Sequence, residues 1–147
     1  MAKIIKNMAD LEKVMGKLLE EYLKRAAIEV EEIIKDFVRT EFYDQYEPKA
    51  YERQEWILKK CTSTDVIQQG NTYSVVVYID PEGVSYADDP ALDVWGGMAE
   101  GWHGNIIQTE GRFWDATLES IDRGGVNDLL KMFRDYLAMK GFNVVVK

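Results

Sequence analysis

A long amphipathic repeat that begins near Asp10 constrains the fold of this chain more than any other feature. Apolar side chains recur there at steps of three and four residues, and Lys, Arg and Glu fill the other face. The apolar positions are Leu11, Met15, Leu18, Tyr22, Ala26, Val30, Ile33 and Phe37, widened by Leu19, Leu23, Ile34 and Val38. The pattern predicts one helix over about residues 10–46, running to Phe42 or to Tyr46, with Asp10 as its N-cap and Pro48 as its stop.

The predicted helix is long for a chain of 147 residues. At 1.5 Å per residue it would span roughly 50 Å, which exceeds the expected diameter of one small domain. The helix is therefore expected to bend near Gly16 or to project and pack on a partner, and the alternative that it lies wholly on its own sheet stays open.

The residues after this helix predict strands. WILKKC at 56–61 fits a helical turn or a strand, and CTSTDVIQQGN at 61–71 reads as a strand, a polar turn and a second strand. Apolar and aromatic side chains alternate over residues 73–79, where β-branched residues are dense. This run predicts a strand, placed centrally in its sheet. DPEG at 80–83 is typical of a turn.

The C-terminal third predicts two helices and a last strand. One apolar pattern covers residues 113–121, and another covers residues 129–137, with Asn127 as its cap and Gly141 as its stop. Residues 142–146 alternate weakly and predict a strand at a sheet edge.

Together these patterns predict an α+β fold, in which a long N-terminal amphipathic helix packs on a small, mostly antiparallel sheet with two C-terminal helices. The length fits a single domain over residues 1–147. Its expected parts are the long helix at about 10–46, the sheet and a long loop rich in Gly and Trp at about 56–111, and the C-terminal helices and edge strand at about 112–147.

The charge of the chain is unevenly distributed. The net charge is −8, and eight acidic residues but no Lys or Arg lie between Lys60 and Arg112. This argues against binding of duplex DNA, which requires clustered cations. The segment is either a solvated acidic face or a surface that must repel nucleic acid, such as the lining of a DNA-conducting tube. The candidate channel-facing acids are Asp80, Glu82, Asp88, Asp89 and Asp93.

No enzyme signature is present, and we expect no catalytic residues, cofactor or metal. His103 and Cys61 are the only histidine and cysteine, which is too few for a metal site. A Cys–His nucleophilic pair stays open as a catalytic arrangement, as does a pair of carboxylates, although nothing in the sequence favours a particular pair. We also expect no secretory signal and no membrane span. A lone cysteine fits a reducing compartment, or a particle assembled in one.

The segment YDQYEPKAYER at 43–53 gathers aromatic residues behind the long helix. Tyrosine and arginine are common at partly buried seams, so the segment is either the junction of helix and sheet or an interface. The Gly-rich loop that follows the strands has the apolar content of an ordered or partner-bound loop. The candidate interface or junction residues of these two segments are Tyr43, Tyr46, Pro48, Tyr51, Arg53, Trp95, Trp102 and His103.

These motifs resemble the head–tail joining (neck) or tail-completion proteins of tailed bacteriophages, found in phages and prophages of Gram-positive bacteria. The resemblance rests on Tyr43-x-x-Tyr46-x-Pro48-x-x-Tyr51-x-Arg53 after a long helix, on WGGMAEGWHGN at 95–105 and on GRFWDATLES at 111–120. It covers about residues 10–145. Gln54 and EWILKK stand where members of the family often carry Thr and a short Leu/Ser segment.

The resemblance implies a structural virion protein without enzymatic activity, assembled in the cytoplasm of the host bacterium. It implies a homo-oligomeric ring, commonly sixfold, that contacts the phage connector and tail proteins, surrounds passing DNA without binding it specifically, and touches no membrane. Two other functions remain open at this point. One is a small phage-encoded intracellular regulator that binds a host protein, and the other is a hydrolase that uses His103 with an acid or with Cys61.

Overall fold

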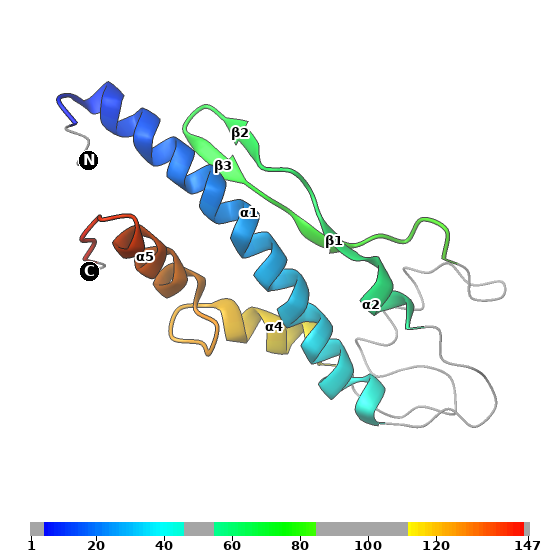
Figure 1. The fold of residues 1–147 in the computed structure, drawn as a ribbon. Helices are drawn as coiled ribbons and strands as arrows, with labels where there is room; N and C mark the ends of the chain where they lie inside the picture. The colour runs from blue at the N-terminus through cyan, green and yellow to red at the C-terminus, as the bar shows by residue number, and fades with distance from the viewer. Residues whose placement is uncertain (1–4, 46–54, 85–111, 146–147) are drawn as a thin grey trace.

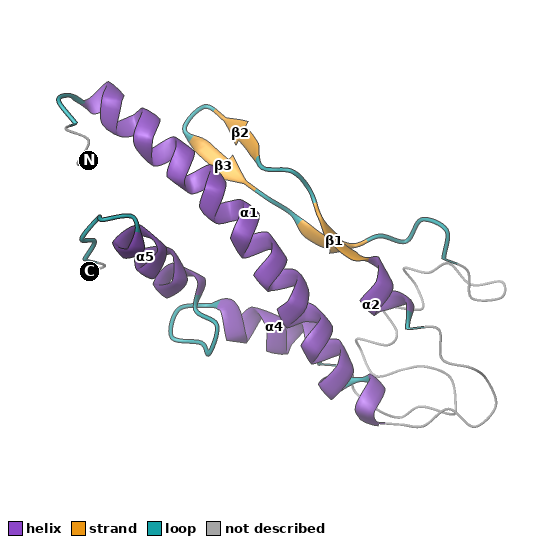
Figure 2. Ribbon diagram, viewed as in Figure 1, coloured by secondary structure: helices purple, strands orange, loops and turns teal. Residues whose placement is uncertain are grey.

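A computed structural model of the protein describes residues 5–45, 55–84 and 112–145. The fold is α+β, as the sequence predicts, with a long N-terminal helix, two small antiparallel sheets and two C-terminal helices (Figures 1 and 2). The elements are α1 (Met8–Glu41), a 3-10 turn η1 (Tyr43–Gln45), α2 (Trp56–Lys60), β1 (Cys61–Ser63), β2 (Ile67–Gln69), β3 (Thr72–Ser74), β4 (Val77–Ile79), α4 (Phe113–Ile121) and α5 (Leu129–Met139).

Helix α1 has 34 residues but begins and ends earlier than the sequence predicts. The N-cap is Asn7 rather than Asp10, and the Asn7 side chain accepts a hydrogen bond from the Asp10 N–H at 2.9 Å. The helix ends at Glu41 instead of continuing to residue 46, because Phe42 and Tyr43 turn into the core and are buried. The predicted stop at Pro48 lies outside the described residues.

Helix α1 lies between the strands on one side and α4 and α5 on the other (Figure 1). Gly16 does not interrupt the helix, which is continuous through it. Instead, Gly16 makes room for the Tyr73 hydroxyl of β3, since a Cβ atom at Gly16 would lie only 2.3 Å from that oxygen. The glycine therefore allows the close approach of β3 to α1.

The four strands form one antiparallel hairpin that a bulge divides into two sheets. β1 pairs with β4, and β2 pairs with β3 across a two-residue loop that begins at Gly70, where φ is +60°. Between the paired stretches the first strand has residues 64–66, whereas the second has only Val75 and Val76. Thr64 bridges the interruption, because its N–H donates to the Val76 carbonyl and its hydroxyl accepts from the Val76 N–H.

The prediction of one central strand over residues 73–79 is therefore wrong in two respects. The run contains two short strands, β3 and β4, and each belongs to a two-stranded sheet. The extra residue in the opposite strand causes the division, and such an insertion bends a hairpin and increases its twist.

Two C-terminal predictions are also corrected. The cap of α5 is Asp128, whose Oδ1 accepts from the Lys131 N–H at 2.9 Å, whereas the Asn127 amide donates to the Ser120 hydroxyl at 2.6 Å. Residues 142–145 form no strand. The predicted stop at Gly141 is confirmed, because Gly141 has φ +92° just beyond the end of α5.

The described core has two parts that share α1. Cluster A lies at the C-terminal end of the helix and consists of Ile34, Val38, Phe42, Tyr43, Ile57, Cys61, Ile79 and Phe113. Cluster B lies in its N-terminal half and consists of Leu18, Tyr22, Ala26, Tyr136 and Leu137. Among the described residues, no helix has the length and apolar composition that crossing a membrane requires.

Candidate functional site

An apolar groove of about 600 Å³ opens beside the middle of α1. Its lining residues come from α1, from the stretch that contains β3 and β4, and from α4 and α5. These elements are far apart in the sequence. Its lining residues are Leu19, Tyr22, Leu23, Ala26, Ala27, Val30, Ile34, Tyr73, Ser74, Val75, Val77, Trp114, Thr117, Leu118, Ile121, Leu129, Leu130 and Phe133. No Lys, Arg, Asp or Glu is among them, so the groove suits an apolar occupant.

The part of the groove that α1 lines runs from cluster B, which includes Tyr22 and Ala26, to Ile34 of cluster A. Ala26 and Ala27 are buried there, 6% and 4% exposed, and their small side chains leave room beside the helix. Larger apolar residues lie on either side of them, with Leu23 toward cluster B and Val30 toward cluster A. The groove is thus open where the helix carries alanine.

The helical part of the lining exposes large apolar side chains. Trp114, Leu118 and Leu130 are 37%, 60% and 43% exposed. The α4–α5 connection fixes their position, because the Asn127 N–H donates to the Ser120 carbonyl at 2.8 Å. Such side chains gathered around a groove mark an interaction surface.

A second contact holds the start of α5 beside the groove. The Tyr22 hydroxyl of α1 donates a hydrogen bond to the Leu129 carbonyl at 2.7 Å. Burial raises the pKa of Tyr22, with the Asp128 carboxylate adding to the shift. The hydroxyl therefore keeps its proton and remains a donor over the whole physiological pH range.

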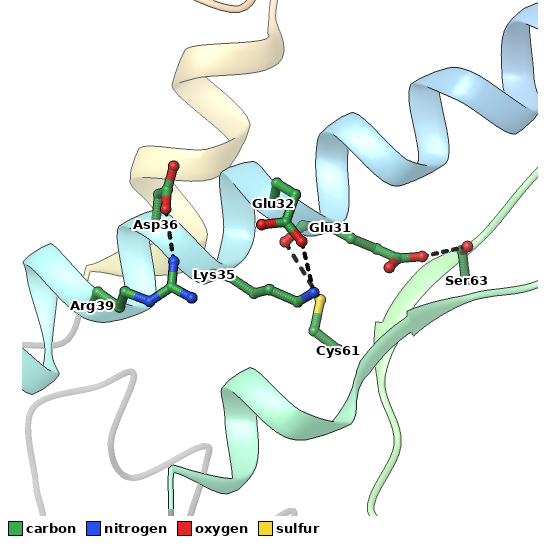
Figure 3. A network of polar contacts seen from close by, with 7 residues as sticks. All are labelled: Glu31, Glu32, Lys35, Asp36, Arg39, Cys61 and Ser63. Atoms are coloured by element: carbon green, nitrogen blue, oxygen red, sulfur yellow. Dashed lines mark hydrogen bonds and ion pairs between the residues drawn. The ribbon is translucent and has the colours of Figure 1, made fainter.

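A polar network joins the hairpin to α1 (Figure 3). The Ser63 hydroxyl donates to Glu31 Oε1 at 2.5 Å, and the Cys61 thiol points to the Glu31 carbonyl, with Sγ 3.9 Å from the oxygen. Further along the helix, Lys35 pairs with Glu32 at 2.8 Å. The Ser63 and Cys61 contacts connect β1 to α1, whereas the Lys35–Glu32 pair lies within α1, and none of these residues lines the groove.

Cys61 is poorly suited to act as a nucleophile. Its side chain is buried, and desolvation, followed by the nearby Glu31 charge, raises the pKa of its thiol from 9.0 to about 11. We predict that iodoacetamide at pH 8 alkylates Cys61 about 100-fold more slowly than an ordinary thiol, because the thiolate is the reactive form. Gln68→Cys, at an exposed position, is the reference thiol. Mass spectrometry measures both rates in one sample, and equal rates would contradict the prediction.

Few of the predicted site residues lie in the described part of the chain. Tyr43 is 4% exposed, and its ring packs edge-on against Phe42 with the centroids 5.3 Å apart. Asp80 Oδ1 accepts from the Glu82 N–H at 2.9 Å in the turn after β4, and Glu82 is exposed. The following predicted residues lie outside the described residues: Tyr46, Pro48, Tyr51, Arg53, Asp88, Asp89, Asp93, Trp95, Trp102 and His103.

The turn that carries two of the predicted acids is fixed by a cation. Lys60 Nζ donates to the Glu82 carbonyl at 2.6 Å. The turn itself is closed by the Val84 N–H, which donates to the Pro81 carbonyl at 3.2 Å, one residue later than DPEG predicts. Among the described residues, no group of three or more His, Cys, Asp or Glu side chains could hold a metal ion.

The fold and the site define a small α+β protein with a long helix, a bulged hairpin and an open apolar groove beside them. The chain belongs to the YomN family, whose family model matches residues 7–139. YomN is a phage-encoded, SPbeta-like protein, so membership indicates a phage protein. No curated protein and no solved structure matches the chain significantly.

Proposed function

We propose that the protein is a structural component of the phage particle, a ring-forming subunit of the neck or tail-completion complex that connects head and tail. The observation that carries the proposal is the open apolar groove with Trp114, Leu118 and Leu130 exposed in its lining. In a protein of a phage family, such a surface supports a role in assembly, where a neighbouring subunit covers it. The proposal assigns no chemical reaction to the protein.

The energetics of the groove support an assembly contact. Removing apolar surface from water contributes about 25 cal/mol for each Å². A groove without charged side chains also has no ion to desolvate when a partner enters, so this gain is opposed by the lost freedom of the two chains but by no charge desolvation on the groove side. A subunit that is stable alone and binds its neighbours through such a groove suits stepwise assembly of a ring.

The proposal also gives the acidic middle of the chain a role. In a ring around passing DNA, Asp80, Glu82 and the acids at 88, 89 and 93 would line the channel and prevent DNA from adhering. The Asp80 carboxylate already accepts a backbone hydrogen bond, whereas Glu82 is exposed. A structure of the assembled ring with the Glu82 carboxylate on the outer surface would reject this part of the proposal.

A single charged substitution in the groove tests the function. We expect phage carrying Leu118→Glu to accumulate separate heads and tails and to lose infectious titre at least 100-fold, because the new carboxylate would have to be buried at the contact. Electron microscopy and titration of lysates measure both effects. Leu118 is 60% exposed, so the isolated variant should fold normally.

Val126→Glu is the matched control. Val126 is 95% exposed, does not line the groove and should tolerate the same substitution with normal titre. If Leu118→Glu phage joined heads to tails normally, the proposed function would be rejected. It would also be rejected if the protein were absent from purified virions and recovered instead with a host protein, as the regulator alternative predicts.

A further inference from the structure

The groove is bordered by a strand edge whose backbone groups are unpaired. The Asp80 N–H donates to the Lys60 carbonyl and the Thr64 N–H donates to the Val76 carbonyl, each at 2.9 Å. Cross-strand bonds alternate along an antiparallel pair, so the even-numbered residues of the second strand face the hairpin partner. The N–H and C=O groups of Tyr73, Val75 and Val77 therefore point to the outer edge.

These three residues also line the groove with their side chains. Their neighbours Val76 and Tyr78 do not line the groove and are exposed, whereas the exposed Ser74 also borders it. In the described part of the chain, no backbone hydrogen bond from another element reaches the edge at Tyr73, Val75 or Val77. An open strand edge beside an apolar groove is the arrangement that accepts an added strand, with backbone bonds along the edge and side chains in the groove.

The C-terminal tail, residues 142–147 with the sequence FNVVVK, has the properties of such a strand. It follows α5, and its first residue is anchored by a hydrogen bond from the Phe142 N–H to the Leu137 carbonyl at 2.9 Å. Val144 and Val145 are 37% and 77% exposed, and residues 142–145 form no strand within their own chain. β-Branched residues in this pattern favour an extended, paired conformation.

We propose that the tail of one copy docks as a third strand on the β3–β4 edge of a second copy, with Val144 and Val146, which share one face of a strand, in the groove of that copy. The inference rests on the proposed function, for which it names the partner at the groove. Six residues at about 3.3 Å each span about 20 Å, which matches the length of the edge from Tyr73 to Ile79. Because tail and groove are different surfaces, the contact is head-to-tail, and repetition of such a contact forms a ring when the rotation between neighbouring copies closes and an open filament when it does not.

Engineered thiols test the contact between two chains. A chain with Val144→Cys is mixed with a differently tagged chain carrying Val75→Cys, and a mild oxidant is added. We expect at least 10-fold more mixed disulfide dimer than with the control chain Gln68→Cys, whose thiol lies exposed on the other strand. The native Cys61 stays in place, since its buried thiol with a raised pKa reacts slowly.

Two results of this experiment would overturn the inference. One is an equal yield of mixed dimer with Val75→Cys and with Gln68→Cys. The other is the formation of an internal disulfide in monomers, with no linked dimer, when Val144→Cys and Val75→Cys are placed in one chain. That result would assign the groove to the tail of the same chain.

Hydrogen exchange of the edge amides is the second measurement. In concentrated full-length protein, we expect the amides of Tyr73, Val75 and Val77 to exchange at least 10-fold more slowly than in a chain that ends at Phe142. Equal exchange in the two chains would overturn the inference.

Both experiments use purified protein, so their failure while Leu118→Glu still blocks head–tail joining would reject tail docking alone. Tail docking together with normal joining in Leu118→Glu phage would reject only the proposed function.

Discussion

Replacement of Phe113 by alanine is expected to lower the free energy of unfolding by about 3–5 kcal/mol, the usual loss for a buried phenylalanine. Phe113 is 0% exposed and belongs to cluster A, where it attaches the first residue of α4 to α1 and the hairpin. The substitution leaves a cavity among residues from three elements, which cannot all move to fill it. Urea denaturation followed by circular dichroism measures the change.

The adjacent residue provides the control. Trp114 follows Phe113 on the same helix, and their rings lie 5.3 Å apart, but Trp114 lines the groove and is 37% exposed. Trp114→Ala should therefore cost less than half as much stability as Phe113→Ala. Equal losses would show that α4 is not attached to cluster A through Phe113.

Replacement of Gly125 by alanine should also destabilise the protein, by about 2–3 kcal/mol, within the range for overpacking. A Cβ atom at Gly125 would lie 2.4 Å from the Glu119 carbonyl oxygen and closer still to that of Ser120. Both are backbone atoms at the end of α4, so the whole α4–α5 connection must shift. That connection includes the Gly125 N–H, which donates to the Asp122 carbonyl at 2.9 Å.

Thermal and urea unfolding measure this effect, with Val126→Ala as the control. Val126 is the next residue and is 95% exposed, so its substitution should change stability by about 0.5 kcal/mol at most. Equal stability of Gly125→Ala and Val126→Ala would contradict the prediction that residue 125 lies too close to the end of α4 for a side chain.

The helices could be predicted because their signal is local. The apolar stripe of α1 repeats over 34 residues, and no alternative strand pattern competes with it. The ends of the helix were predicted less well. Asn7 and Asp10 are both good caps, and sequence does not reveal which side chain reaches the free N–H groups. Asp10 then lies in the first turn, where its charge favours the helix dipole.

The division of the hairpin into two sheets could not be predicted from local sequence. Val75 and Val76 have the same β-branched character as the paired residues around them, yet they lie opposite the bulge. The interruption depends on the extra residue at 64–66 in the other strand, and thus on register. The tail fails as a predicted strand within its own chain for a related reason, because a strand requires a partner edge.

The groove could not be predicted, although most of its lining residues lie in elements that were. Trp114 and Leu118 are four residues apart on α4. This spacing places them on one face of the helix but does not reveal whether that face is buried or exposed. Their exposure depends on how far α4 and α5 stand from the hairpin across α1. That distance is set by contacts such as Tyr22 with Leu129, which are 107 residues apart in the chain.

The division of the core into two clusters along α1 has a mechanical consequence. Cluster A joins the C-terminal end of the helix to the hairpin and α4, and cluster B joins its N-terminal half to α5. A pull on one end is therefore transmitted to the other through the helix itself, through the hairpin beside it and through the α4–α5 connection, and the groove lies between these links. A segment bound in the groove would contact the middle of α1, and the two ends of the helix would then resist an applied force together.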